Sequence, residues 1–167
     1  MLDRVREAVF SSLGERVVGA RVLDLFAGSG SLGLEALSRG AERVRFVEEG
    51  RDALQALRGN IGTLGLEESA EVLGADAFSE RARAAPVGAD GGWTDLVFLD
   101  PPYPMIEGEL RDEVLGLAEV IGTECLGEGG VIVLHAPKGA LRAEEFGAEL
   151  AARERTYGST AIWYLGG

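Results

Sequence analysis

The sequence predicts an α/β fold of the Rossmann-like, doubly wound type, with a mainly parallel sheet and helices on both of its faces. Short apolar runs typical of buried strands alternate with segments whose apolar residues repeat at helical spacing. The first of these runs leads directly into a glycine-rich turn and a helix. The last two runs are separated only by Gly158 and its neighbours, which favours a closing antiparallel hairpin.

The predicted elements follow one another along the whole chain. Strands are expected at residues 21–26, 43–48, 70–76, 95–100, 129–136, 149–157 and 159–165. Helices are expected at the N-terminus (Leu2, Val5, Val9 and Leu13 share one face), at residues 31–39, 51–64, 77–85 and 107–121, and in a short piece near 141–146. Gly40 is a plausible stop for the second helix, and residues 86–93, rich in Gly and Pro, are the best candidate for a loop.

Length and composition bound the class of protein. A chain of 167 residues suits a single domain, so we expect residues 1–167 to form one. Hydrophobic residues make up 46% and charged residues 26%, as in globular proteins. No apolar run approaches the roughly 18 residues that a membrane span needs. The N-terminus MLDRVREAVF carries charges where a signal peptide needs an apolar stretch, so we expect a cytoplasmic protein without membrane contact.

The glycine-rich turn after the first strand is the first candidate site. Glycines allow a sharp turn and a close approach to a ligand, and the following helix offers free amides at its N-terminus. Gly28, Gly30 and Gly33 also match the G-x-G-x-x-G pattern of dinucleotide-binding proteins, and a purely structural turn is the simpler alternative. The residues predicted here to bind a cofactor are Asp24, Phe26, Ala27, Gly28, Ser29 and Gly30.

Two further carboxylates end predicted strands. Glu48 lies about 20 residues beyond the glycines, where a carboxylate can accept hydrogen bonds from both hydroxyls of a ribose. Asp76 can accept a hydrogen bond from an adenine amine, while the amide of Ala77 can meet a ring nitrogen. An N-capping role for Asp76 is an equally good interpretation. NAD and S-adenosylmethionine share the adenosine, so these residues do not separate the two cofactors.

The segment Asp100-Pro101-Pro102-Tyr103 distinguishes S-adenosylmethionine from NAD as the cofactor. The two prolines have no amide hydrogen, so the carbonyls of Asp100 and Pro101 and the Asp100 carboxylate form a group of acceptors. Such a group suits an exocyclic base amine, whose two N–H bonds can be held while its nitrogen attacks a methyl group. Tyr103 offers a flat face on which an extruded base can stack. We therefore predict methyl transfer from S-adenosylmethionine, catalysed mainly by positioning and fixed dipoles; the alternative is a surface turn.

The remaining reactive side chains give weaker signals. Cys125 is the only cysteine, which excludes an internal disulfide and a multi-cysteine zinc site, and we expect it to be a buried thiol. His135 is the only histidine and stands in an apolar strand, a pattern more typical of a packed histidine than of a general base. We therefore expect no metal site.

The charge of the chain weighs against nucleic-acid binding. With 16 basic and 28 acidic residues the formal net charge is −12, and Lys138 is the only lysine, whereas nucleic-acid binders usually present a basic surface. Arg4 and Arg6 are candidate substrate contacts together with Tyr103. Because they lie about 200° apart on a helix, both cannot face one groove. Arg153 and Arg155 are weaker candidates.

Together these residues resemble a known family. The segments that carry the resemblance are DRVREAVF at 3–10, ARVLDLFAGSGSLGLEALSRGA at 20–41, Glu48, Asn60, Asp76-Ala77, DPPY at 100–103 and RTYGSTAIWYL at 155–165. The chain is similar over nearly its whole length to the RsmD-type 16S rRNA guanine-N2 methyltransferases, a family of class I S-adenosylmethionine-dependent enzymes. That resemblance implies a seven-stranded sheet, S-adenosylmethionine as cofactor, and 16S rRNA or a small-subunit assembly particle as partner of a monomeric enzyme.

Several alternatives stay open at this point. The DPPY segment is shared with adenine-N6 methyltransferases acting on DNA or RNA, so it indicates the reaction and not the base. An NAD(P)-dependent oxidoreductase would explain the glycines but not DPPY, and a binding module without catalysis would leave DPPY without a role. Members of the resembled family usually carry a basic segment before DRVRE, implicated in RNA contact, whereas here Met1 and Leu2 lead directly into Asp3.

Overall fold

The computed structural model describes residues 1–83 and 94–166. These residues form one seven-stranded sheet with the strand order β3-β2-β1-β4-β5-β7-β6. The strands are β1 (Arg21–Leu25), β2 (Arg43–Glu48), β3 (Ala70–Gly74), β4 (Thr94–Leu99), β5 (Leu126–Pro137), β6 (Ala152–Tyr157) and β7 (Thr160–Gly166). The first five are parallel to one another, and β7 lies antiparallel between β5 and β6. The predicted fold class, including the closing hairpin at Gly158, is confirmed.

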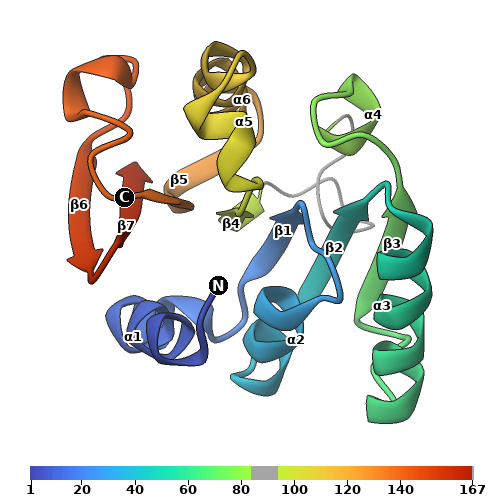
Figure 1. Cartoon of the computed structure of the whole chain (residues 1–167). Helices are drawn as coiled ribbons and strands as arrows, with labels where there is room; N and C mark the ends of the chain where they lie inside the picture. The colour runs from blue at the N-terminus through green and yellow to red at the C-terminus, as the bar shows by residue number, and fades with distance from the viewer. Residues whose placement is uncertain (84–93, 167) are drawn as a thin grey trace.

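Helices cover both faces of the sheet (Figure 1). They are α1 (Asp3–Leu13), η1 (Gly14–Val17), α2 (Ser31–Ser38), α3 (Arg51–Leu64), α4 (Glu80–Arg83), α5 (Tyr103–Glu107), α6 (Arg111–Glu124) and η2 (Ala143–Glu145). The apolar residues of α1, α2 and α3 pack in one core cluster, and those of α4, α5 and α6 in another on the opposite face. Of the face predicted for the N-terminal helix, Val5, Val9 and Leu13 are buried, whereas Leu2 precedes α1 and is exposed.

The order of the strands fixes where a ligand can bind. From β1 the chain proceeds to β2 and β3 on one side, and from β4 to β5 on the other. The loops that leave the carboxyl ends of β1 and β4 therefore turn to opposite faces and open a crevice between them. The glycine-rich turn follows β1, and Asp100 follows β4, so the topology brings the two candidate sites to one edge of the sheet.

The structure differs from the predicted elements mainly after β4. The helix expected at 107–121 is α6, which begins at Arg111, and α5 before it was not expected. α5 begins directly at Tyr103 with Pro104 in its first turn, where a missing amide is tolerated. It ends at Gly108, where an added Cβ would lie 2.6 Å from the Pro104 carbonyl oxygen. The short helix near 141–146 is the 3₁₀ turn η2, and η1 was not expected.

Other boundaries shift by a few residues. The strand expected at 129–136 begins earlier, at Leu126, with a register irregularity opposite Thr94 and Leu96, and β6 begins at Ala152 rather than at 149. The predicted loop at 86–93 and the end of the helix predicted at 77–85 lie outside the described residues. Among the described residues, no helix is both long and apolar enough to cross a membrane.

Candidate active site

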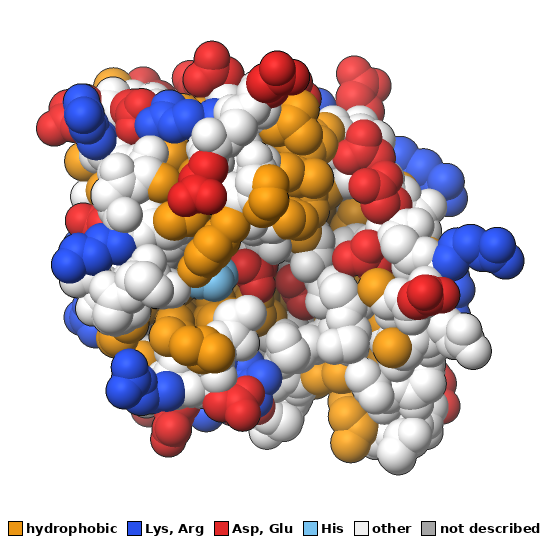
Figure 2. All heavy atoms as spheres, viewed as in Figure 1, with side chains coloured by type: hydrophobic (Ala, Val, Ile, Leu, Met, Phe, Trp, Pro, Cys, Tyr) orange, Lys and Arg blue, Asp and Glu red, His pale blue; other side chains and the backbone are white. Residues whose placement is uncertain are grey.

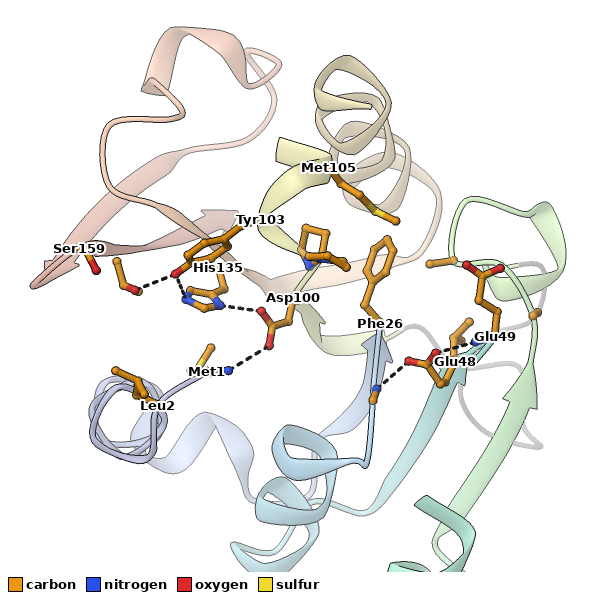
Figure 3. A pocket seen from close by; sticks show the side chains of 17 residues that line it. Met1, Leu2, Phe26, Glu48, Glu49, Asp100, Tyr103, Met105, His135 and Ser159 are labelled. Atoms are coloured by element: carbon orange, nitrogen blue, oxygen red, sulfur yellow. Dashed lines mark hydrogen bonds and ion pairs between the residues drawn. The ribbon is translucent and has the colours of Figure 1, made fainter. Parts of the chain in front are cut away.

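A cavity of about 700 Å³ opens at the carboxyl ends of the central strands (Figure 3). This size falls within the range of small-molecule sites. In Figure 2 it is a hollow with the single histidine and red carboxylates at its base. Its lining combines both candidate segments with parts of β2, β5 and β7 and with residues that follow β3. The lining residues are Met1, Leu2, Phe26, Gly28, Val47, Glu48, Glu49, Ala75, Ala77, Asp100, Pro101, Pro102, Tyr103, Met105, His135, Ser159 and Thr160.

The glycine-rich turn enters this cavity with a strained backbone. Phe26 has a φ of 60°, the only positive φ of a non-glycine residue in the described part of the chain. Residues in that region cost free energy and are found mainly where function requires the geometry. Gly28, with a φ of 57°, has open space where a Cβ would point, while a Cβ on Gly30 would lie 2.4 Å from a Leu57 methyl carbon. The turn therefore packs tightly on α3 at Gly30 and stays open toward the cavity at Gly28.

Asp24 supports the turn from below. Its side chain is 1% exposed, and its carboxylate accepts the amide hydrogen of Gly33 at 3.0 Å. Burial raises the pKa of the Asp24 carboxyl to about 8, a rise that the Gly33 amide opposes and that the charges of Asp100 and Glu48 increase. Asp24 does not line the cavity, and neither do Ala27, Ser29 and Gly30. These predicted cofactor residues shape the turn, and a direct contact to the cofactor stays a prediction for them.

Glu48 joins the second strand to the turn. One carboxylate oxygen accepts the Gly28 amide at 2.8 Å, and the other accepts the amides of Glu49 and Gly50 at 3.0 and 2.7 Å. The carboxylate is thereby fixed at the cavity wall, which is the position that the prediction of a ribose contact requires. From α3, the Asn60 amide donates to the Ser29 carbonyl at 3.0 Å and ties the far side of the turn.

At the end of β3 the two interpretations of Asp76 separate. Its carboxylate accepts the amide of Phe78 at 2.9 Å, and its carbonyl accepts the Ser79 hydroxyl at 2.6 Å, as in a turn that starts a helix. Asp76 itself does not line the cavity, whereas Ala77 does. The turn thus accounts for the Asp76 carboxylate, and the predicted adenine contact stays a prediction, for which Ala77 is the residue at the cavity.

The segment from Asp100 to Tyr103 forms the opposite wall. All four residues line the cavity. The Asp100 carboxylate lies 2.6 Å from His135 Nδ1, and the Tyr103 hydroxyl lies 3.0 Å from His135 Nε2 and 2.9 Å from the Thr160 hydroxyl. The rings of Tyr103 and His135 meet edge to face at 5.3 Å. A neutral imidazole that donates from Nδ1 to Asp100 must accept from the Tyr103 hydroxyl at Nε2, so the network defines one tautomer.

Sequence reasoning missed His135 as part of the site. The histidine is buried at 6% exposure, as expected for a packed side chain, but its two ring nitrogens contact the predicted acceptor and the predicted stacking residue. One signal was present in the sequence. His135 stands near the carboxyl end of a strand that neighbours β4, and in this fold carboxyl ends carry ligand-binding residues.

The predicted arginine contacts lie outside this cavity. Neither Arg4 nor Arg6 lines it; the N-terminal residues that do are Met1 and Leu2, and the Met1 amino nitrogen is 4.0 Å from an Asp100 oxygen. Arg6 forms an ion pair with Asp3 at 3.2 Å. The structure therefore does not place either arginine at the reacting group, and a contact with a large substrate beyond the mouth stays a prediction.

Negative charges outnumber positive ones in the cavity. Glu48, Glu49 and Asp100 line it, and no Lys or Arg is among its lining residues within the described ranges. The Met1 amino group, 4.0 Å from an Asp100 oxygen, adds one positive charge. Within those ranges, no group of three or more His, Cys, Asp or Glu side chains is placed to hold a metal ion. Two amides of the glycine-rich segment, those of Gly28 and Gly33, already donate to carboxylates of the protein. The arrangement thus suits a ligand with positive rather than negative charge.

Comparison with known proteins identifies relatives of the whole chain. Residues 1–166 match the protein family described as "Conserved hypothetical protein 95". The chain is 39% identical over 160 residues to the "Putative rRNA methyltransferase YlbH" of Bacillus subtilis, covering 96% of this chain and 83% of that protein. It is 40% identical over 117 residues to "Ribosomal RNA small subunit methyltransferase D" of Escherichia coli, covering 70% of this chain and 54% of that protein.

A solved structure agrees with these relatives. The protein described as "Putative methyltransferase yhhF" from Escherichia coli superimposes with a TM-score of 0.81 at 32% sequence identity. The superposition covers 99% of this chain and 87% of the other. Sequence and structure thus point to the same relatives.

Proposed function

We propose that this protein transfers a methyl group from S-adenosylmethionine to an exocyclic amine of a base in ribosomal RNA. The premise is its family, since the chain belongs to the "Conserved hypothetical protein 95" family. Of the relatives above, YlbH is named a putative rRNA methyltransferase and the Escherichia coli relative a methyltransferase of the small ribosomal subunit RNA. The resemblance to the RsmD-type family is confirmed. The proposed target is the N2 amine of a guanine in 16S rRNA, carried by naked RNA or by a small-subunit assembly particle.

One observation carries the choice of cofactor. In the dinucleotide-binding pattern, amides of the glycine-rich turn bind an anionic pyrophosphate. Here the Gly28 amide donates to Glu48, and the described lining of the cavity holds three carboxylates and no Lys or Arg, with the Met1 amino group as a single positive charge beside Asp100. A pyrophosphate would be repelled there, whereas a sulfonium cation would be attracted. The NAD(P)-dependent alternative is therefore disfavoured by charge as well as by the DPPY segment.

The residues that fit this cofactor occupy the β1–β3 side of the cavity. Glu48 would accept hydrogen bonds from the ribose hydroxyls, and the amide of Ala77 would meet the adenine ring. Gly28, with open space in place of a Cβ, allows close approach of the ligand to the turn. S-adenosylmethionine would supply an electrophilic methyl group on a cationic sulfur.

The residues that act on the base lie on the β4–β5 side. The Asp100 carboxylate and the backbone carbonyls of Asp100 and Pro101 would accept hydrogen bonds from the amine N–H groups. These hydrogen bonds orient the lone pair of the nitrogen. The new N–C bond would form as the bond between the methyl group and sulfur breaks, with neutral S-adenosylhomocysteine as the leaving group. The nitrogen becomes acidic in this step, and Asp100 can take its proton and release it to water. His135 contacts Asp100 Oδ1 at 2.6 Å, whereas Oδ2, 4.0 Å from the Met1 amino nitrogen, has no hydrogen bond within the described ranges and would accept from the substrate amine. Tyr103, fixed through its hydroxyl, presents its ring to the base.

The test is product analysis. The full chain is incubated with methyl-labelled S-adenosylmethionine and either 16S rRNA or small-subunit particles from a strain that lacks the methylation, and the RNA is digested to nucleosides. We expect labelled N2-methylguanosine. N6-methyladenosine as sole product would instead establish the adenine alternative, and label in DNA alone would exclude the RNA substrate.

A calorimetric titration tests the cofactor separately. We expect S-adenosylhomocysteine to bind and NADH not to bind. Tight binding of NADH alone would overturn the assignment of the cavity. Binding of S-adenosylhomocysteine without transfer to any nucleic acid would favour the binding module that lacks catalysis.

A further inference from the structure

A second groove, about 500 Å³ in volume, lies between the C-terminal part of α1 with η1 and the closing hairpin of β6 and β7. Three arginines line it: Arg16 from η1 and Arg153 and Arg155 from β6, all exposed. Tyr164 of β7 forms part of its wall. In the view of Figure 2, blue side chains follow the left margin of the molecule, over the β6 and α1 side shown in Figure 1.

The arginines of this groove are arranged by the strand. Arg153 and Arg155 are two residues apart on β6, so both point to the face that α1 covers, whereas Glu154 points to the opposite face. Their guanidinium carbons lie 5.5 and 6.0 Å from the centroid of the Tyr164 ring. Burial raises the pKa of the Tyr164 phenol, which favours the neutral form of the ring that the two guanidinium groups contact. Two cations are thus held side by side on one aromatic platform.

These charges are not neutralised within the described ranges. Arg6, Arg39 and Arg111 each form an ion pair with a carboxylate of the chain. For Arg16, Arg153 and Arg155, no carboxylate lies within ion-pair distance in the part of the chain that the structure describes. In a chain of net charge −12, three such arginines in one groove form a local basic surface against the overall charge.

The groove and the active site lie along the same β6–β7 hairpin, although no residue of the described ranges lines both. Tyr157, the last residue of β6, pairs with Thr160, which lines the active-site cavity. Arg155 and Arg153 precede Tyr157 by two and four residues, which corresponds to about 7 and 13 Å along an extended strand. A chain of phosphates that leaves a base in the cavity would therefore meet the two arginines in succession.

We propose that Arg16, Arg153 and Arg155 bind the phosphate backbone of the RNA whose base occupies the active site. The proposal rests on the proposed function, which it supplies with a binding surface. Arginine suits the role because its planar guanidinium donates to phosphate oxygens in pairs. Phosphate contacts position a nucleic acid without reading its sequence, so the groove fixes how the RNA enters and leaves the choice of base to the cavity.

A purely structural role for these arginines makes a different prediction. Charged side chains on an edge strand prevent pairing with another sheet, and an arginine stacked on Tyr164 also protects its ring. Either of these roles depends on the size and stacking of the side chains rather than on phosphate binding. Substitution of the arginines would then lower thermal stability or increase self-association, and would leave the salt dependence of RNA binding unchanged.

The experiment measures RNA binding by the full chain saturated with S-adenosylhomocysteine, using a fluorescein-labelled single-stranded RNA of mixed sequence over a range of salt concentrations. The variants are Arg153→Gln with Arg155→Gln, and the same pair changed to Lys. The matched control changes Arg58 and Arg81 to Gln, since both are exposed arginines without an ion-pair partner in the described ranges and lie on α3 and α4.

The Gln pair is expected to weaken binding about tenfold or more and to reduce the slope of log K against log salt by about 1.4, since each single-strand phosphate contact contributes about 0.7. The Lys pair should keep most of the slope, and the Arg58 and Arg81 control should keep both affinity and slope. Equal affinity of the Gln pair and the unchanged protein would overturn the proposal, as would a loss of melting temperature alone.

Methyl transfer is measured in parallel, so that the two proposals fail separately. If the unchanged protein methylates RNA and the Gln pair does so with the same KM, the groove is not the binding surface while the function stands. If the unchanged protein binds RNA through the groove but transfers no methyl group, the groove stands and the proposed function fails. If the Gln pair has a raised KM for RNA and an unchanged affinity for S-adenosylhomocysteine, both the groove and the proposed function are supported.

Discussion

The two walls of the active-site cavity are built in different ways. On the β1–β2 side, carboxylates hold backbone amides that are close in the chain: Asp24 binds Gly33, nine residues on, and Glu48 binds Gly28, twenty residues back. On the β4–β5 side, side chains hold one another across longer separations, 35 residues for Asp100 and His135 and 57 for Tyr103 and Thr160. The first wall is shaped by main-chain geometry, and the second by a side-chain network.

This difference has a functional consequence (Figure 3). A wall of amides and fixed turns holds the same shape with or without small changes in side chains, which suits the recognition of an invariant cofactor. A wall of linked side chains can orient single lone pairs and accept a proton, which suits the reacting amine. Substitutions on the two walls should therefore separate into effects on binding and effects on turnover.

The largest effect is expected on the network side, at Asp100. Asp100→Asn keeps the shape of the side chain but cannot take the amine proton, so kcat should fall about 10²- to 10³-fold, the range seen when one preorganised polar group is lost. The affinity for S-adenosylhomocysteine, measured by calorimetry, should change less than about twofold. Glu107→Gln, an exposed carboxylate of α5, is the control. Unchanged turnover in Asp100→Asn would remove this carboxylate from the mechanism.

The next effect belongs to the backbone side. Glu48→Gln exchanges a charged acceptor for a neutral amide, and hydrogen bonds to charged groups contribute about 1.5–3 kcal/mol, so cofactor affinity should fall about 10- to 100-fold while kcat at saturation changes little. Glu49→Gln removes the same charge from the neighbouring position of the cavity. Equal losses in the two variants would show that the negative field matters and not the hydrogen bonds of Glu48.

The same contrast explains what the sequence could and could not predict. The glycine-rich turn, Glu48 and the Asp100–Tyr103 segment are local patterns at strand ends, and the structure brings residues of all three to one cavity. The partners of Asp100 come from strands that are neighbours only because β5 pairs with β4 and with β7. No periodicity shows that pairing, so His135 was interpreted as a packed residue.

His135 should give a smaller effect, and two substitutions divide its contacts. The amide of His135→Asn stands near the former Nδ1 and can still donate to Asp100, whereas that of His135→Gln reaches toward the former Nε2 and Tyr103. We expect kcat to fall about 3- to 10-fold in the Gln variant, the value of one hydrogen bond, and less in the Asn variant. Cofactor affinity should be unchanged in both.

The reverse order of the two variants would show that His135 acts through Tyr103 and not through Asp100. Melting temperatures add a readout for packing. If His135 acted only by packing, the two variants would lose stability and kcat together, whereas a contact to Asp100 lowers kcat more in the Gln variant at equal stability.

The smallest effect on activity, and a distinct effect on stability, is expected at Asp24. Its folded-state pKa of about 8 exceeds the usual 3.8, so between about pH 4 and 8 the folded protein holds a proton that the unfolded chain releases. Stability from this group is therefore complete below about pH 4 and is lost as the pH rises to 8, at up to about 1.4 kcal/mol per pH unit. Asp24→Asn should remove that slope, because its amide oxygen still accepts from Gly33 and does not titrate.

Urea unfolding at pH 5 and pH 8 measures the difference, with Asp52→Asn on the exposed surface of α3 as the control for a lost charge. If the free energy of unfolding changed equally between pH 5 and pH 8 in Asp24→Asn and in the unchanged protein, Asp24 would be ionised in the folded state. The β1–β2 side of the cavity would then carry a buried negative charge beneath the glycine-rich turn. In that case the preference of the cavity for a cation would come from below the cofactor as well as from the carboxylates that line it.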